Sequence, residues 1–299
     1  MPRVLCAGHI NWDVTLRVDT LPKPDGEARL RSQYQSGGGS AANVATALAA
    51  LGIQAGVLGS VGDDEHGRAA RRSLREHGVE TDPITIIPDR PTTVKYLIVE
   101  AASDGQVMVL GNEGANEAIE PADITESTVR DFDHLHLTGQ RPATAAALAE
   151  HATTTDITVS VDPGRRLGDR DYETALDVAD IVFLNERETD CLPNPGDVGA
   201  DGTFDETTVV CKDGKRGATV YTAEGSYHHD GYTVDTVDTA GAGDAFAAGF
   251  LAVVLEHREN GDIDHERCLE VANACGALAT TVEGAQISFE PRAIEEVLD

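Results

Sequence analysis

The sequence predicts an α/β fold in which a mostly parallel β-sheet is covered by helices on both faces. Short runs rich in β-branched residues alternate along the chain with longer runs in which alanine and leucine recur at helical spacing. This alternation is typical of parallel sheets built from strand–helix–strand units. At 299 residues the chain is long enough for one large domain, and we expect a single domain over residues 1–299.

Strands of the main sheet are expected where apolar runs are short and bounded by turn residues. These runs are residues 4–10, 55–61, 134–138, 157–161, 181–184 and 209–212. Helices are expected where apolar residues recur every three or four positions. These segments are residues 41–51, 65–77, 143–153, 172–178, 245–256 and 265–282. Residues 194–205 are rich in Pro, Gly and Asp, and we expect them to form a long exposed loop.

Two pairs of strands break this pattern, because polar and apolar residues alternate in them. They are residues 14–18 with 28–34, and residues 93–100 with 106–110 joined at Ser103-Asp-Gly105. We expect these strands, within about residues 14–36 and 93–112, to form a small antiparallel sheet that stands off the main body. Such a sheet would be a lid over a cleft or a pairing surface for a second copy. The alternative is an extra edge of the main sheet.

The charge balance is strongly negative, with 52 acidic against 23 basic residues and a net charge of −29. Such a field argues against nucleic acid or an anionic membrane as a partner. It is typical of a very salty cytoplasm, where the screening length falls to about 3 Å at 1 M salt. We therefore expect a salt-loving, halophilic source, and the alternative is an ordinary acidic cytosolic enzyme.

The cysteines and the chain start predict a reduced, cytoplasmic protein. The five cysteines include no C-x-x-C pair, and Cys6, Cys211 and Cys275 lie in apolar runs, as expected of small core residues. The sequence shows neither a charged-then-apolar leader nor a membrane-length apolar run.

The segment Asp238-Thr-Ala-Gly-Ala-Gly-Asp244 is the most informative motif, because an apolar helix follows it directly. Its glycines allow the backbone to approach a ligand, and the free N–H groups of the helix start favour an anion. Asp244 beside that anion site is suited to accept a proton from an attacking hydroxyl. Phosphoryl transfer needs both features. The alternative is a glycine-rich helix start with an acidic first turn.

A second glycine cluster, Gly37-Gly-Gly-Ser-Ala-Ala-Asn43, precedes the first expected helix. Small residues admit a ligand, and the Asn43 amide can donate to and accept from hydroxyls. Asn11 and Asp13 follow the first strand, and ligands of open α/β sheets bind at strand ends. Turn capping is the alternative for Asn11 and Asp13. The chain contains no G-x-x-x-x-G-K-[ST] or G-x-G-x-x-G motif, so we exclude a P-loop enzyme.

Four blocks in order resemble the ribokinase-like (PfkB) carbohydrate kinases, and the resemblance covers essentially the whole chain. They are Gly38–Asn43, Asn185–Glu188, Lys212–Gly217 and Asp238–Asp244. The resemblance implies a doubly wound, mostly parallel central sheet flanked by helices, with a small β-sheet lid that often forms the dimer contact. It also implies ATP as phosphoryl donor, Mg²⁺ as cofactor and a homodimer.

The resemblance also implies roles for individual residues. Asp244 would be the catalytic base, and the helix N-terminus formed by Gly241, Ala242, Gly243 and Asp244 would be the anion hole. Asn185 and Glu188 would hold Mg²⁺ through water, although the same pair has the spacing of a helix capping box.

The remaining implied roles concern the substrates and a monovalent cation. The acceptor hydroxyls would be held by Asn11, Asp13, Gly38, Gly39 and Asn43. The nucleotide would be bordered by Lys212, Gly214, Gly217 and Asn273, with helix packing as the alternative for Asn273. Arg166, in the element Asp162-Pro-Gly-Arg-Arg166, would contact phosphate or substrate, with a solvated arginine as the alternative. Asp238 and residues 283–286 would bind K⁺.

Two departures from the ribokinases bear on the acceptor. Ser40 stands where ribokinases carry a lysine, and Leu137-Thr-Gly-Gln140 stands where they carry a sugar-binding carboxylate. We expect an ATP-dependent kinase that phosphorylates a hydroxymethyl group of a small sugar. A nucleoside kinase of the same family is the alternative, and a catalytically inactive sugar-sensing protein is a third possibility.

Overall fold

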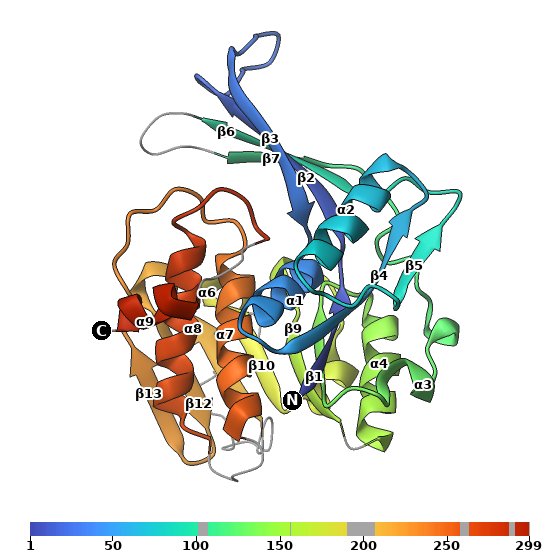
Figure 1. Cartoon of the computed structure of the whole chain (residues 1–299), viewed down its shortest axis with the longest axis vertical. Coiled ribbons are helices and arrows are strands. Elements are labelled where there is room, and N and C mark those ends of the chain that lie inside the picture. Colours follow the sequence, from blue (N-terminus) through green and yellow to red (C-terminus); the bar gives the residue numbers. More distant parts are fainter. Residues whose placement is uncertain (101–106, 156, 190–206, 258–262, 287–290, 299) are drawn as a thin grey trace.

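The computed structural model describes residues 1–100, 107–155, 157–189, 207–257, 263–286 and 291–298, and it contains two separate β-sheets (Figure 1). The expected turn at Ser103–Gly105 and the expected loop 194–205 lie outside the described residues. No described helix is both long and apolar enough to cross a membrane.

The main sheet has the strand order β13-β12-β11-β10-β9-β8-β1-β4-β5. Its strands are β1 (Arg3–Gly8), β4 (Gln54–Gly62), β5 (Ile84–Ile87), β8 (His134–Thr138), β9 (Thr158–Asp162), β10 (Ile181–Asn185), β11 (Thr208–Lys212), β12 (Ala218–Thr222) and β13 (Gly225–His229). Pairing is parallel from β5 to β11, while β12 and β13 are antiparallel. The chain moves outward from β1 in one direction to β4 and β5 and in the other to β8, so the order reverses at β1.

Helices cover both faces of the main sheet, as predicted, because side chains of β1 alternate between two apolar cores. Val4 and Cys6 face one core, and Leu5 and Ala7 face the other. The first core is covered by α1 (Ser40–Ala50), α2 (Glu65–Glu76), α7 (Ala242–His257), α8 (His265–Ala279) and α9 (Pro291–Leu298). The second is covered by α3 (Glu126–Val129), α4 (Pro142–Thr154) and α5 (Glu173–Asp177). Among the described cysteines, Cys6, Cys268 and Cys275 are buried and none is bonded to another.

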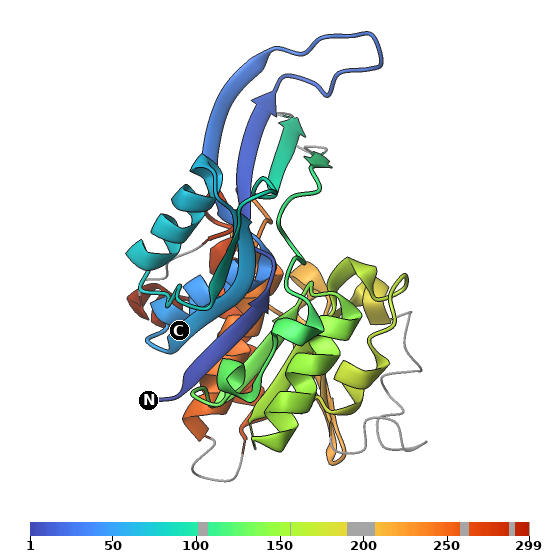
Figure 2. The same cartoon turned by 90° about the vertical axis from the view of Figure 1, so that its right-hand side faces the viewer.

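The second sheet stands off the main body as a lid, and it is not an extra edge of the main sheet (Figure 2). Its strand order is β3-β2-β6-β7, formed by β2 (Asn11–Val18), β3 (Leu30–Gly38), β6 (Val94–Glu100) and β7 (Val107–Gly111). The two expected antiparallel pairs are present, but β2 and β6 pair in parallel. The parallel pairing is possible because α1, β4, α2 and β5 form a long crossover between these strands.

Some boundaries differ from the sequence prediction. Strands β5, β12 and β13 were not expected, because their runs are short and partly polar. Helix α8 ends at Ala279 rather than at residue 282. The hydroxyls of Thr280 and Thr281 donate to carbonyls one turn back, and the Thr280 carbonyl accepts from the N–H groups of Val237 and Asp238. These bonds end the helix and hold the loop that leads to α7.

Candidate active site

The expected site residues lie mainly at the carboxyl ends of parallel strands, on the edge from which the lid projects. Asn11 and Asp13 follow β1, Asn185 ends β10, and Lys212 ends β11. The order of strands reverses at β1, and crevices at such a switch point are where open α/β sheets bind ligands.

Asp244 lies in the first turn of α7, as the motif predicted. Gly241 just before the helix has φ 76°, and a Cβ there would lie 2.5 Å from the Ala285 carbonyl oxygen, so only glycine fits. The Ala242 N–H already donates to the Thr239 carbonyl at 3.4 Å. The N–H groups suited to an anion at this helix start are therefore mainly those of Gly243 and Asp244.

The Asp244 carboxylate accepts a hydrogen bond of 2.6 Å from Nδ2 of Asn43, in the first turn of α1. Burial and the nearby charge of Asp162 raise the pKa of Asp244 to about 6, although the Asn43 bond and Lys212 oppose the rise. A carboxylate with this pKa is ionised at neutral pH and binds a proton more readily than an ordinary aspartate. These properties suit a general base.

Three buried polar atoms that have no hydrogen-bond partner among the described residues lie around Gly38 and Gly39. They are Nδ2 of Asn11, Oδ1 of Asp13 and Oδ1 of Asn43. A Cβ at Gly38 would overlap the Asp13 carboxylate, and Gly39 has φ 97°. Burial raises the pKa of Asp13 to about 6, and Lys95 on β6 of the lid limits the rise. Buried polar atoms are rarely left unpaired, so this group is suited to bind hydroxyls of an acceptor.

Asn185 and Glu188 form the capping box that their spacing predicted. The Asn185 N–H and side-chain amide donate to the Glu188 carboxylate at 2.9 and 2.5 Å, and Asn185 Oδ1 accepts from the Glu188 N–H at 3.1 Å. Burial and Asp162 raise the pKa of Glu188. In the described part of the chain, no three His, Cys, Asp or Glu side chains are close enough to hold a metal by themselves. A carboxylate has about four lone pairs, so Glu188 can accept further bonds from the waters of a Mg²⁺ ion in addition to its bonds with Asn185.

The side chain of Lys212 points toward the start of α7. The sequence predicted it only as a residue bordering the nucleotide, beside the turn after β11. Its Nζ lies 2.6 Å from Oδ2 of Asp162 and 3.7 Å from the place of a Cβ on Gly243. Burial alone would lower the pKa of Lys212, but the charges of Asp162, Glu188 and Asp244 raise it. Lys212 therefore carries a buried positive charge beside the anion site.

The other nucleotide-side residues lie around the turn after β11. Gly214 and Gly217 have φ of 57° and 85°. Asn273 is buried, and its Nδ2 donates to the Leu269 carbonyl within α8 at 2.8 Å, which is the helix-packing arrangement. Its Oδ1 faces Gly231, which packs against Gly217.

The tertiary structure brings Asp238 to the segment 283–286, as the expected cation site requires. Asp238 Oδ2 accepts from the Tyr34 hydroxyl at 3.0 Å and from the Gly284 N–H at 3.2 Å. Its Oδ1 accepts from the Ala240 N–H at 3.0 Å. Tyr34 belongs to β3, so this loop is also tied to the lid.

Arg166 does not contact the Asn43–Asp244 pair. Its Nη1 lies 2.9 Å from Oε1 of Glu117. Sequence reasoning missed Glu117, Asn116 and His9. The signal that could have revealed them is the Gly- and Asn-rich run of residues 111–117 directly after an expected lid strand.

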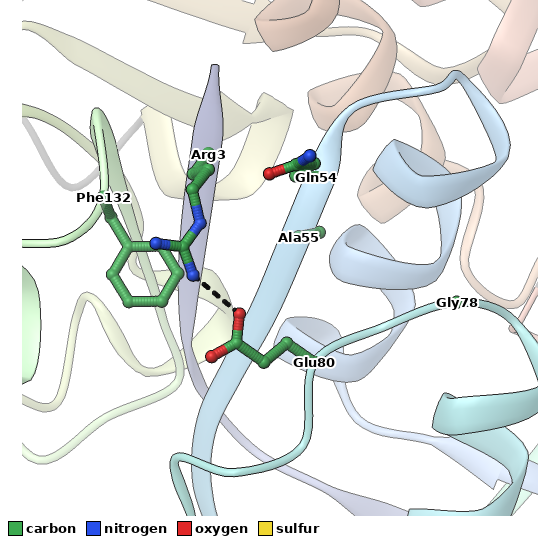
Figure 3. A pocket seen from close by; sticks show the side chains of 6 residues that line it. All are labelled: Arg3, Gln54, Ala55, Gly78, Glu80 and Phe132. Carbon is green, nitrogen blue, oxygen red and sulfur yellow. Dashed lines mark hydrogen bonds and ion pairs between the residues drawn. The ribbon is translucent and has the colours of Figure 1, made fainter. Parts of the chain in front are cut away.

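A separate hollow of about 510 Å³ lies at the amino ends of β1 and β4, on the edge opposite the site (Figure 3). Arg3 in it is bonded to Glu80 at 2.8 Å and to the Asp131 carbonyl at 2.7 Å, and it covers the Phe132 ring at 4.8 Å. The Arg3 guanidinium is thus already paired with neighbouring segments of the chain, and we assign no chemistry to this hollow.

The chain is similar to known kinases over almost its whole length. The sequence profile of the pfkB family carbohydrate kinases matches residues 1–292. An ATP-dependent ribose-1-phosphate kinase from Halopiger xanaduensis is 57% identical over 286 residues, covering 96% of this chain and 94% of the relative. A nucleoside kinase from Methanothermobacter thermautotrophicus is 26% identical, covering 96% and 92%. An E. coli protein provisionally described as ribokinase II, solved with ATP and Mg²⁺, has a TM-score of 0.83 at 24% identity, covering 100% of this chain and 99% of that chain. The chain therefore belongs to the pfkB family of carbohydrate kinases.

Proposed function

We propose that this kinase transfers the γ-phosphoryl group of ATP to the primary 5-hydroxyl of ribose 1-phosphate. The observation that carries the proposal is the Asn43–Asp244 pair, a raised-pKa carboxylate held in the first turn of α7 beside free N–H groups. The likeness to the Halopiger ribose-1-phosphate kinase supports this acceptor. The sequence predicted a small sugar as the acceptor, and the proposal specifies ribose 1-phosphate.

In the proposed reaction, Asn11, Asp13 and Asn43 hold the sugar hydroxyls above the glycines Gly38 and Gly39. Asp244 accepts the proton of the 5-hydroxyl as its oxygen forms a bond to the γ-phosphorus. The bond from that phosphorus to the β–γ bridging oxygen breaks, and ADP leaves. The N–H groups at the start of α7 stabilise negative charge on the transferred phosphoryl group.

Mg²⁺ and ATP are proposed to lie between β10 and β11. Asn185 and Glu188 would hold the waters of Mg²⁺, and the ion would neutralise phosphate charge when bound with ATP. Lys212 would attract the phosphate tail, since its Nζ faces Gly243. Gly214 and Gly217 leave room for the nucleotide, and Asn273 would lie behind it. K⁺ would bind beside Asp238 and Gly284.

The lid is proposed to form a homodimer contact. Large apolar side chains are exposed along its strands, namely Leu30, Tyr96, Val107, Met108, Val109 and Leu110. A run of exposed apolar residues on one small sheet is unusual for a monomer, and the lid of a second copy would offer the same apolar surface in a symmetric contact. A cytoplasmic location and a salty cell interior would fit the net charge of −29.

A nucleoside kinase is the second candidate, supported by the Methanothermobacter relative. A nucleoside also presents a primary 5-hydroxyl on a furanose, so the same base and glycines would serve it. A catalytically inactive sugar-sensing protein has less support, because Asp244, Asn185 and Glu188 are all in place.

The test is an acceptor panel scored by ADP release in concentrated KCl, with ribose 1-phosphate, ribose, fructose and adenosine. We expect ribose 1-phosphate to give the highest kcat/KM and phosphorus NMR to show a new ester at the 5-position. Adenosine as the best acceptor would establish the nucleoside kinase instead. No ADP release above the ATP-only control with any acceptor would support the sensor.

A further inference from the structure

Three arginines and a histidine surround one carboxylate at the carboxyl ends of β1, β8 and β9. Oε1 of Glu117 lies 3.0 Å from Nε2 of His9, 2.9 Å from Nη1 of Arg166 and 3.0 Å from Nη1 of Arg170. Arg141 approaches Oε2 of the same group at 3.8 Å and also binds Glu120 at 2.6 Å. We name His9, Arg141, Arg166 and Arg170 the arginine cluster.

Glu117 is fixed in place at some conformational cost. Its φ of 60° lies in the left-handed region, which a glutamate rarely occupies. The neighbouring backbone holds it there, because the Ala115 N–H donates to the Pro91 carbonyl and the Ala115 carbonyl accepts from Ser60. Burial alone would raise the pKa of Glu117, but His9 and Arg170 hold it at about 2. Glu117 is therefore a permanent anion that positions the cluster.

The arginine cluster has more N–H donors than the carboxylates beside it can occupy. Each guanidinium carries five N–H donors, and one carboxylate cannot occupy those of three arginines. The Arg166 side chain is 52% exposed and that of Arg170 is 24% exposed, while Glu117 beneath them is only 13% exposed. A surplus of fixed positive charge is thus accessible to solvent in a chain whose net charge is −29.

The arginine cluster borders the acceptor group of Asn11. The residue before Glu117, Asn116, donates from Nδ2 to Oδ1 of Asn11 at 2.5 Å and accepts from the Ile10 N–H at 3.2 Å. The His9 carbonyl lies against Gly39, and a Cβ on Gly139 would lie 3.2 Å from the His9 ring. Gly39 in turn accepts from the Asn43 N–H at 2.8 Å. Asp244 contacts one member of the acceptor group, Asn43, and the residue next to Glu117 contacts another, Asn11, so the same acceptor residues connect Asp244 to the arginine cluster.

We infer that the arginine cluster binds the phosphate of a phosphorylated sugar acceptor whose hydroxymethyl group faces Asp244. This rests on the proposed function and assigns the residues that distinguish a sugar phosphate from a free sugar. A furanose carries its C1 substituent and its hydroxymethyl group on opposite sides of the ring oxygen, so an acceptor between the two ends can reach both. Guanidinium groups match phosphate geometry through paired hydrogen bonds.

The test measures binding in the Asp244→Asn protein without ATP, so that no phosphoryl transfer takes place, by calorimetric titration with ribose 1-phosphate and with ribose. We expect ribose 1-phosphate to bind at least about tenfold more tightly. Arg166→Ala in this background should weaken the binding of ribose 1-phosphate about 10- to 100-fold, because a charged hydrogen bond is lost. The affinity for ribose should not change. Arg166→Lys should give an affinity for ribose 1-phosphate between those of the parent protein and the Arg166→Ala variant, since the charge remains without the paired geometry.

Arg68→Ala is the matched control, because Arg68 lies on α2 in an exposed pair with Asp63, and it should change neither affinity. Arg170→Ala is a second cluster variant, with thermal unfolding checked for each protein. Preferred binding of ribose 1-phosphate that survives both cluster substitutions would overturn the inference and leave the proposed function intact. Equal binding of ribose 1-phosphate and ribose before any cluster substitution would overturn both.

Discussion

Asp13 and Asp244 are the two carboxylates whose pKa the fold raises to about 6, and burial is the main cause for both. A raised pKa means that the ionised form is disfavoured in the folded protein. The group therefore stabilises the fold at low pH, and this contribution is lost as pH rises through about 6. Both carboxylates thus reduce stability at neutral pH in positions where chemistry needs an ionised group.

Replacement of Asp244 by asparagine separates the effect of its charge on stability from its effect on catalysis. We expect Asp244→Asn to lower kcat by about 10² to 10⁴-fold, as for loss of a general base. It should also raise the free energy of unfolding at pH 7, by at most about 3 kcal/mol, because the costly charge is gone. Oδ1 of Asn43 has no partner and could accept from the new amide. Steady-state kinetics and thermal unfolding measure both.

Asp63→Asn is the control for this substitution, since Asp63 is an exposed carboxylate paired with Arg68. It should change neither the rate nor the stability appreciably. An Asp244→Asn protein with wild-type kcat would contradict the assigned base.

The same pKa values predict the acid side of the pH profile. We expect kcat/KM for the acceptor to fall below about pH 6, because both Asp13 and Asp244 are then protonated. If both must be ionised, the logarithmic slope approaches two at lower pH. Asp13→Asn should reduce that slope to one, whatever its effect on the plateau. A slope unchanged by Asp13→Asn would show that Asp13 ionisation is not required.

At the scale of secondary-structure elements, the loops at Asp238 and at residues 283–286 are held together by the end of α8 and by the lid. Thr280 carbonyl accepts from the N–H groups of Val237 and Asp238, and Arg17 of β2 pairs with Glu283 at 3.0 Å. A cation bound between these loops would therefore influence both the start of α7 and the lid.

We predict that K⁺ activates the enzyme through Asp238. Replacing KCl by tetramethylammonium chloride at equal concentration should lower kcat several-fold, and Asp238→Asn should remove the difference between the salts. Asp235 is an exposed carboxylate upstream, so Asp235→Asn is the control. This variant should keep the difference in kcat between the two salts. Equal rates of the wild type in both salts would contradict potassium activation.

The lid strands predict the state of association. We expect the wild type to be a dimer by light scattering and Val109→Asp to be a monomer, because a charge on the exposed apolar strand β7 would have to be desolvated on association. Ile86→Asp, on the exposed edge strand β5, introduces the same charge elsewhere and should stay dimeric. A monomeric wild type, or a dimeric Val109→Asp protein, would contradict the lid contact.

At the scale of the whole molecule, the excess of acidic residues dominates. With a net charge of −29, mutual repulsion destabilises the compact state unless salt screens it. We predict that the midpoint of thermal unfolding rises strongly between about 0.1 and 3 M KCl. NaCl at equal concentration should give most of the same rise in the unfolding midpoint. This comparison separates the screening of charge by any salt from the specific binding of K⁺. A midpoint independent of salt would be incompatible with adaptation to a salty cytoplasm.

Much of the site could be predicted because its parts are contiguous in the sequence. Gly241 requires a positive φ, and the capping box at Asn185 and Glu188 has a fixed spacing of three, so both leave a local pattern. The resemblance implied Arg166 as a phosphate or substrate contact, but its grouping with Glu117 and the other members of the arginine cluster could not be predicted in this way. Arg166 is 49 residues from Glu117, and nothing near either residue indicates the other.

The alternating elements, the separate lid strands, the glycine-rich helix start and the resemblance to the family can all be read from the sequence. These features depend on side-chain periodicity and backbone freedom, which act over a few residues. The folded chain is needed to show that Asn43 binds Asp244, 201 residues away, that Lys212 faces Gly243, and that β2 pairs with β6 in parallel. The physical reason is that such contacts depend on strand order and register, which the whole chain sets together through burial of its two cores.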